Sequence, residues 1–180
     1  DLNKIIDCTI KDNVGAAGPS PLSIFNRGGL SLGGSNNHYI ANNLIQGNMY
    51  GIFSATWSMI SENSTFINNT FISNSYGAIA PRHFDNTLIS NNFIYESISS
   101  SDWYWDIQNS FWNSSTKGNY WAKTTGDGFS QTCNDSEPDG ICDVHYDVLN
   151  DRPCTVNCST NTDYKPLSRH ALMWEFTPAQ

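Results

Sequence analysis

The sequence has few basic residues and no long apolar segment. Of its 180 residues, 9 are Lys or Arg and 17 are Asp or Glu, which gives a formal net charge of −8. Binding to nucleic acid depends on basic groups that neutralise phosphates, so this balance argues against a nucleic-acid partner. We also expect no membrane span in this chain, because no run of apolar residues is long enough to cross a bilayer. Neither a Met nor a signal peptide precedes Asp1, which indicates a processed or truncated chain.

Paired asparagines recur through the first half of the chain. The pattern Ile-x-Asn-Asn-x-(Ile/Phe) is assigned to Ile40–Ile45, Ile67–Ile72 and Ile89–Ile94, with the asparagine pairs at Asn42/Asn43, Asn68/Asn69 and Asn91/Asn92. The pairs follow one another at intervals of 26 and 23 residues. A period of this length, combined with strand-like alternation of apolar and polar residues, predicts a β-solenoid in which each repeat makes one coil. Like residues of neighbouring coils are then stacked at a spacing of about 4.8 Å.

The solenoid is expected to extend beyond these three copies. Residues 5–10 fit the same template, which places Cys8 at the position of the second asparagine and predicts that Cys8 is a buried free thiol. Residues 13–35 are expected to form a loop or an irregular coil, and a less regular turn is expected from Ile107 to Trp121. The prediction is therefore an all-β fold with about five coils over residues 1–121, and with residues 122–180 as a loop-rich cap of the same domain. Little sequence is left to cover the first coil, so an upstream portion of the same protein or an identical subunit is expected to stack on it.

Cysteines and glycosylation sequons indicate where the protein resides. Four of the five cysteines lie close together in the C-terminal part, as is typical of disulfides formed in an oxidising compartment. Proximity favours Cys133 with Cys142 and Cys154 with Cys158, while other pairings and a tetrathiolate zinc site remain alternatives. Sequons for N-glycosylation occur at Asn63, Asn68, Asn113, Asn134 and Asn157. Together these features predict an extracellular or cell-surface location.

An acidic loop in the C-terminal part predicts a structural calcium site. Residues 135–143 match the pattern DxDxDGxxD with one conservative change, at Glu137. In such a loop alternate side chains direct carboxylates at one centre, while glycine permits the tight turn. The expected ligands are the carboxylates of Asp135, Glu137, Asp139 and Asp143, the backbone oxygen of Ile141, and Asp127 from the preceding Gly-Asp-Gly. A Cys133–Cys142 bridge would close this loop, and the alternative is a solvated acidic loop without a metal.

Several short motifs of the second half follow one another in a fixed order. Gly118–Trp121 is followed by Gly126-Asp127, Asp139–Asp143, Tyr146–Val148 and Asp163–Leu167. This order resembles the ending of NosD-like right-handed parallel β-helix proteins, also called the carbohydrate-binding and sugar-hydrolase (CASH) β-helix domain. The resemblance implies a right-handed parallel β-helix and a secreted or surface protein of the archaeal type. It extends from about Asn36 to Leu167, with Cys142 in place of the second glycine of the acidic loop and two cysteine-bearing insertions in the tail.

One polar cluster within the coils has side chains suited to acid–base chemistry. Arg82, His83 and Asp85 lie at the bend between the second and third copies of the repeat. Polysaccharide-degrading β-helix enzymes use carboxylate clusters, paired acids in the hydrolases and a basic residue in the lyases. No nucleophile motif accompanies this cluster, and a loop with such residues is more often simply solvated.

Aromatic residues concentrate in the last predicted coil. Indole rings stack on sugars, and alternation along residues 103–105 would place Trp103 and Trp105 on one face, so these two are candidates for glycan binding or for plugging the coil. Trp112 and Trp121 are expected to plug the apolar end of the solenoid.

Two functions from different classes remain. The favoured one is a non-enzymatic extracellular module, structural or glycan-binding, of a surface protein, adhesin or filament, stabilised by calcium, disulfides and N-glycans. The alternative is a polysaccharide lyase or glycoside hydrolase of the β-helix type, and the two differ in whether paired carboxylates and a basic residue share one face.

Overall fold

The computed structural model describes residues 3–13, 28–32, 35–53, 61–80, 83–95, 106–108, 110–148, 152–154 and 161–171. Within these ranges the regular structure is almost entirely β, and α1 (Phe129–Thr132) is the single short helix. The strands that precede it are β1 (Asn3–Ile6), β2 (Thr9–Lys11), β3 (Gly28–Ser31), β4 (His38–Ala41), β5 (Leu44–Gln46), β6 (Tyr50–Phe53), β7 (Ser61–Glu62), β8 (Thr65–Ile67), β9 (Thr70–Ile72), β10 (Gly77–Ala80), β11 (His83–Asp85), β12 (Leu88–Ser90), β13 (Phe93–Ile94), β14 (Asp106–Gln108) and β15 (Tyr120–Trp121). The strands that follow it are β16 (His145–Asp147), β17 (Arg152–Cys154) and β18 (Thr162–Asp163).

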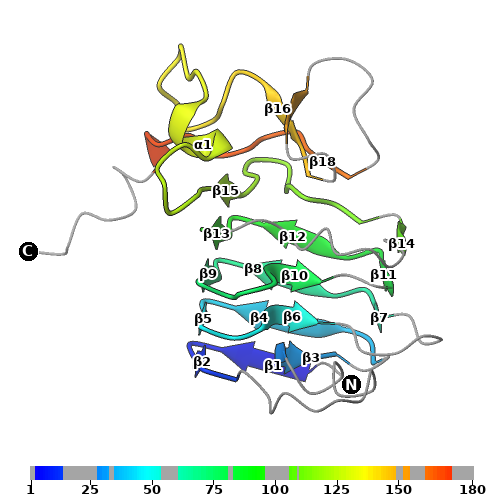
Figure 1. Cartoon of the computed structure of the whole chain (residues 1–180). Helices are drawn as coiled ribbons and strands as arrows, with labels where there is room; N and C mark the ends of the chain where they lie inside the picture. The colour runs from blue at the N-terminus through cyan, green and yellow to red at the C-terminus, as the bar shows by residue number, and fades with distance from the viewer. Residues whose placement is uncertain are drawn as a thin grey trace, which may run out of the picture.

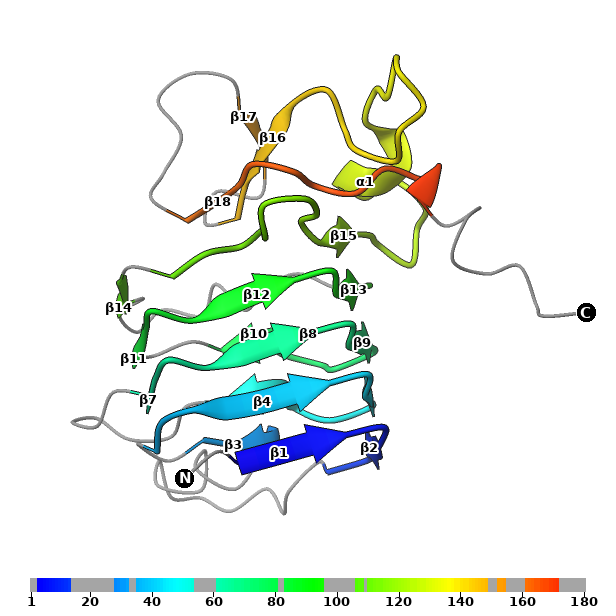
Figure 2. The ribbon, with the colours of Figure 1, turned by 180° about the vertical axis from the view of Figure 1, so that it is seen from behind.

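Parallel sheets form the body of the molecule. The strands β1, β4, β8 and β12 make a four-stranded sheet, and β2, β5, β9, β13 and β15 make a five-stranded sheet. Two three-stranded sheets have the orders β3-β6-β10 and β7-β11-β14. Every pairing within these four sheets is parallel. Figures 1 and 2 show the strands as stacked layers that rise from the blue N-terminal strands, an arrangement consistent with a β-helix-like fold. The predicted all-β class is confirmed.

Two parts of the chain with weak repeat signals also join these sheets. The strand β3 lies within residues 13–35, predicted as a loop or irregular coil, and pairs in parallel with β6. Between Ile107 and Trp121, where a less regular turn is expected, β14 pairs with β11 and β15 pairs with β13. The stacking therefore extends to both ends of the predicted coil region.

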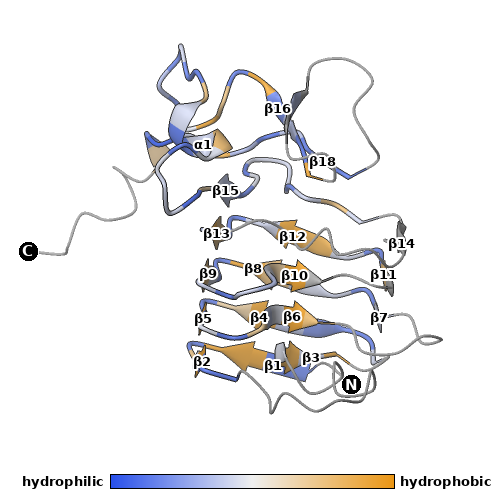
Figure 3. Cartoon of the chain, in the orientation of Figure 1, coloured by the Kyte–Doolittle hydropathy of each residue, from blue (hydrophilic) through white to orange (hydrophobic). Residues whose placement is uncertain are grey.

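The core is a set of apolar side chains aligned from layer to layer. In the first sheet Ile5, Ile40, Phe66 and Ile89 are in register, and in the five-stranded sheet Ile10, Ile45, Phe71, Ile94 and Trp121 are in register. All of them except Ile5 and Ile10 are buried. Figure 3 shows apolar strands joined by polar corners.

The assignment of the second repeat to Ile67–Ile72 is wrong by one residue. Phe66 and Phe71 are fully buried in the core columns, whereas Ile67 and Ile72 are only half-buried. The corner residue Asn68 has a positive φ of 57°, as Asn42 (56°) and Asn91 (52°) do. In each repeat the core residues lie two positions before and three positions after the corner asparagine. For Asn68 these positions are Phe66 and Phe71. The asparagine pairs themselves are placed as predicted.

Left-handed backbone residues make three columns of corners. The first column consists of Asp7, Asn42, Asn68 and Asn91, the second of Asn37, Asn63 and Asn86, and the third of Asp12, Gly47 and Ser73. Asn, Asp and Gly adopt this conformation at the least cost, which explains why they recur where each strand turns into the next.

Cys8 has the position that the repeat predicted, but its environment differs. Its backbone N–H donates to Oδ1 of Asn43 at 2.9 Å, as the template requires. Its thiol is free, as expected, but the residue is exposed, so the prediction of a buried thiol is wrong. The later members of this column are buried because layers lie on both sides of them, whereas among the described strands β1 and β2 have a neighbour on one side only.

A cap of different construction covers the last layer. It comprises α1 and the antiparallel sheet β17-β16-β18, and lies above β15 in Figure 1. Tyr146 of the cap packs between Trp121 and Phe129, with ring centroids 4.9 Å from each, and Trp112 lies 5.8 Å from Trp121. Trp112 and Trp121 are buried at this junction, which confirms that they plug the end of the layered body. No helix of the described segments is long and apolar enough to span a membrane.

Candidate functional site

Buried asparagines connect successive layers through a column of hydrogen-bonded side chains, here called the amide ladder. Its members are Asn43, Asn69, Asn92 and Asn119, all buried. At each step the backbone N–H and the Nδ2 of one asparagine both donate to Oδ1 of the next, at 2.9 to 3.1 Å. The ladder therefore runs through every layer from β5 to β15.

The remaining proton of each amide also has a partner. The Nδ2 atoms donate to main-chain carbonyls of the preceding layer at 2.8 to 3.0 Å, and the acceptors are Ile5, Ile40, Phe66 and Ile89. Each Nδ2 group thus donates both of its protons. The Oδ1 atoms of Asn69, Asn92 and Asn119 each accept two bonds from the preceding asparagine, and Oδ1 of Asn43 accepts from Cys8 N. A buried polar group without a partner costs about 1–3 kcal/mol, so a shift of one layer against the next would be strongly unfavourable. The amide ladder fixes the register of the stack.

A second, shorter ladder follows the next corner. The backbone N–H and Nδ2 of Asn13 donate to Oδ1 of Asn48, and those of Asn48 donate to Oδ1 of Asn74, at 2.9 to 3.1 Å. This column is not part of the predicted repeat. Its signal is an asparagine five residues after each of Cys8, Asn43 and Asn69.

The carboxylate of Asp163 in β18 terminates the amide ladder. Its Oδ2 accepts from the backbone N–H of Asn119 at 2.7 Å, from Nε1 of Trp121 at 2.9 Å and from Nδ2 of Asn119 at 3.4 Å. Its Oδ1 accepts from the backbone N–H of Lys165 at 3.1 Å. A Cβ on Gly118 would lie 1.9 Å from Asp163 Oδ1, so only glycine admits this approach. Asp163 is completely buried, and burial raises its pKa to about 7, against hydrogen bonds that lower it.

The sequence pattern gives Asp163 no special role. It occurred only as the first residue of the tail motif Asp163–Leu167. The partner Asn119 lies 44 residues earlier, outside the repeat interval, so periodicity gives no reason to pair the two. The only signal was that the Gly118–Trp121 motif and the tail motif occur together.

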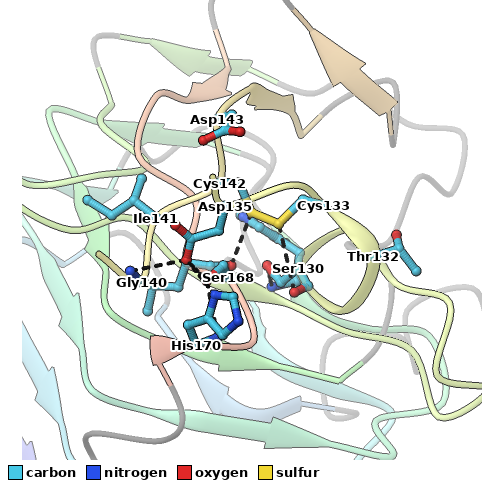
Figure 4. Close-up of a disulfide and its surroundings, with 12 residues drawn as sticks. Ser130, Thr132, Cys133, Asp135, Gly140, Ile141, Cys142, Asp143, Ser168 and His170 are labelled. Atoms are coloured by element: carbon cyan, nitrogen blue, oxygen red, sulfur yellow. Dashed lines mark hydrogen bonds and ion pairs between the residues drawn. A yellow bond between two sulfur atoms is a disulfide. The ribbon is translucent and has the colours of Figure 1, made fainter. Parts of the chain in front are cut away.

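The predicted calcium loop folds against the last described segment of the chain, residues 161–171. Oδ2 of Asp135 accepts from Ser168 Oγ at 2.5 Å, from His170 Nδ1 at 3.0 Å and from the backbone N–H of Gly140 at 3.2 Å. Figure 4 shows these three contacts around one oxygen of Asp135. Burial works to raise the pKa of Asp135, but the bonds from Ser168, His170 and Gly140 outweigh it and hold that pKa below its usual value.

The other predicted ligands lie around the same loop but do not converge on one point. Asp143 accepts with both carboxylate oxygens from the backbone N–H of Ser136 at 3.2 Å, and Asp139 accepts from the backbone N–H of Ile141 at 2.9 Å. Glu137 is exposed. Within the described residues no three acidic, His or Cys side chains are gathered as metal ligands would be.

Asp127 is fully exposed and has a local partner. Thr125 donates a hydrogen bond to it, and this bond lowers the pKa of the Asp127 carboxyl below its usual value. The structure shows no hydrogen bond between Asp127 and the loop at 135–143.

The predicted pairing of Cys133 with Cys142 is confirmed. The two residues form a disulfide with a Cα–Cα distance of 5.7 Å, which closes the acidic loop at its base. A site of four thiolates is thereby excluded, because two of the four are oxidised. The side chain of Cys154 and all of Cys158 lie outside the described residues, so their pairing stays a prediction.

Several other candidates fall wholly or partly outside the described part of the chain. Arg82, Trp103 and Trp105 are not described, and for His83 only the backbone in β11 is. Asp85 is the last residue of that strand and its backbone O accepts from Asn63 N at 3.1 Å. The catalytic and glycan-binding assignments therefore stay predictions.

Four of the five sequons lie in described segments. Asn63, Asn68 and Asn134 are exposed, and Asn113 is half-buried, with its Oδ1 accepting from Tyr164 N at 3.1 Å. Asn63 and Asn68 also accept side-chain bonds from Asn86 and Asn91 of the next layer. Asn157 lies outside the described residues.

Comparison of the chain with family models, with curated proteins and with solved structures found no match.

Proposed function

We propose that this chain is a non-enzymatic, extracellular structural module: a right-handed parallel β-helix of about five coils that serves as a rigid rod in a surface protein, adhesin or filament. The observation that supports this proposal best is the amide ladder. Buried side-chain amides link every layer from Asn43 to Asn119, and a buried carboxylate of the cap closes the series. Such a ladder stiffens the stack along its length, which is the property a spacer requires.

The surface features support an extracellular setting within the same proposal. A disulfide is present between Cys133 and Cys142, and Asn63, Asn68 and Asn134 present exposed sequon asparagines. In this proposal N-glycans, disulfides and calcium stabilise the rod, and Trp103 and Trp105 are the side chains that would stack on a glycan. The resemblance to NosD-like proteins points to the same class of secreted or surface protein.

The proposal is tested by pulling the full chain from its ends in a single-molecule force experiment. We expect high-force unfolding for the wild type, because the layers must lose several amide bonds together. The matched variant Asn69→Ala removes one ladder member and should unfold at clearly lower force, whereas Asn134→Ala, an exposed asparagine, should behave as the wild type. Equal forces for all three proteins would contradict the structural role.

A parallel assay addresses the enzymatic alternative. The protein is incubated with polyuronates and neutral polysaccharides, with calcium and with a chelator, and the products are analysed for new reducing or unsaturated ends. We expect no new ends. Steady release that disappears in an Asp85→Asn variant would replace the structural proposal with a polysaccharide-degrading enzyme.

A further inference from the structure

One oxygen of Asp135 is buried and has no hydrogen-bond partner. The side chain of Asp135 is 2 % exposed, and while Oδ2 accepts three bonds, Oδ1 is enclosed without any. Buried polar atoms almost always have partners, and an unpaired carboxylate oxygen is among the costliest exceptions. Figure 4 shows this oxygen on the side of Asp135 that faces the Ile141 segment, away from His170. An electropositive ligand at this position would remove the penalty.

The loop that contains Asp135 carries side chains with the chemistry of a hard-cation site. The loop supplies the carboxylates of Glu137, Asp139 and Asp143 within eight residues of Asp135, and oxygen donors of this kind suit Ca²⁺. The disulfide at the base of the loop limits its conformational freedom before any ion binds. Asp139 and Asp143 each accept from one backbone N–H of the loop, Asp143 with both of its carboxylate oxygens, and exposed loop carboxylates exchange such bonds readily.

We propose that Ca²⁺ bound by this loop uses Asp135 as a shared residue, with Oδ1 on the ion and Oδ2 on the last segment, so that calcium anchors residues 161–171 over the amide ladder. This inference deepens the proposed function and rests on it. A carboxylate has lone pairs on both oxygens, so coordination through Oδ1 leaves the bonds from Ser168 and His170 in place. The ion completes the polar contacts of Asp135.

Segment 161–171 is connected to the loop at one end and to the ladder at the other. Near the loop, the bonds of Ser168 and His170 to Asp135 are accompanied by a backbone bond from Cys142 N to Pro166 O at 2.8 Å. Toward the ladder, Gly118 N donates to Lys165 O at 2.7 Å and Leu167 N donates to Asn119 O at 2.9 Å. The same segment carries the carboxylate that terminates the ladder. An ion that fixes Asp135 therefore also keeps residues 161–171 in contact with the end of the amide ladder.

The test combines calorimetric titration of Ca²⁺ into the full-length, disulfide-intact chain with hydrogen exchange followed by mass spectrometry. We expect saturable binding, a rise in Tm of about 5–10 °C at 100 times Kd, and slower exchange in residues 118–121 and 161–171. Mg²⁺, which demands a smaller and more regular oxygen shell, should give a markedly smaller rise.

Three variants distinguish calcium binding by the loop from the effect of calcium on residues 161–171. Ser168→Ala and His170→Ala remove the contacts to Oδ2 while leaving every loop carboxylate, so calcium should bind with a Kd within a few-fold of wild type but should no longer slow exchange in residues 161–171. Ser136→Ala changes an exposed serine of the same loop and should retain the full response. His170 is one-third exposed, so its variant is expected to fold even where Ser168→Ala does not.

Two results would overturn the inference: no calcium binding to the wild type, or binding without slower exchange in residues 161–171. The proposed structural role would still stand after either result if the ladder amides exchange slowly without calcium. Failure of this inference is therefore distinguishable from failure of the proposed function.

Discussion

Replacing the carboxylate that ends the amide ladder should change how stability depends on pH. Asp163 is completely buried, and burial raises its pKa to about 7 from an ordinary value of 3.8. The folded protein therefore retains a proton on this group between about pH 4 and pH 7, whereas the unfolded chain does not. The stability that this group contributes is fully present below the unfolded pKa and is lost as the pH rises through the folded pKa.

The size of the effect follows from the difference between the two pKa values. The free energy of unfolding of the wild type should fall by on the order of 4 kcal/mol between about pH 4 and pH 8 because of this group. Asp163→Asn cannot ionise, so it should abolish this part of the pH dependence. The variant also places an amide where the backbone N–H of Lys165 now donates, which should cost about 1–3 kcal/mol below pH 5.

The assay is urea unfolding of wild type and Asp163→Asn at intervals from pH 4.5 to 8.5 in the presence of a chelator. Titration of other groups is common to both proteins and cancels in the difference between them. We expect the stability of the wild type relative to the variant to fall steadily as the pH rises from 4.5 and to level off above about pH 7, where Asp163 is ionised in both the folded and the unfolded chain. Asp12→Asn, which neutralises an exposed aspartate at a corner where asparagine is equally tolerated, should show no such change. Parallel curves for wild type and Asp163→Asn would show that folding does not raise the pKa of Asp163.

Three further predictions concern the same contacts. Asn92→Ala removes amide bonds to both neighbouring layers and should lower the free energy of unfolding by about 3 kcal/mol or more in urea titrations, while Asn134→Ala should leave it within about 0.5 kcal/mol. Gly118→Ala would press a methyl group against the carboxylate of the cap, 1.9 Å away, and should abolish protection of the cap amides in hydrogen exchange; unchanged protection would contradict the close approach. Reduction of the bond between Cys133 and Cys142 should lower the free energy of unfolding by about 2–3 kcal/mol, and an unchanged Tm after reduction would show that the bridge has no stabilising role.

The layered body could be predicted from the sequence because its contacts repeat. The asparagine pairs fix both the corner and the ladder position, so the stacking of Asn43, Asn69 and Asn92 follows from their spacing alone. The position of the second repeat was wrong because its core residues are phenylalanines, while isoleucines stand one residue further along at Ile67 and Ile72. A template anchored on the corner asparagine would have selected Phe66 and Phe71.

The cap could not be predicted in the same way because its contacts do not repeat. The bond from Asn119 to Asp163 joins residues 44 apart, and that from Ser168 to Asp135 joins residues 33 apart, each of which occurs once. The exposure of Cys8 was missed for a related reason. A repeat predicts the position of a side chain within its layer, but burial depends on whether a second layer covers it.

The most direct test of the account is hydrogen exchange of asparagine side-chain amides, measured by NMR on the full-length chain with assigned Nδ2 resonances. If the amide ladder holds the layers in register, the Nδ2 protons of Asn43, Asn69, Asn92 and Asn119 should exchange orders of magnitude more slowly than those of the exposed Asn134. Exchange of the ladder amides at the rate of Asn134 would contradict the stacked register on which the proposed rod depends.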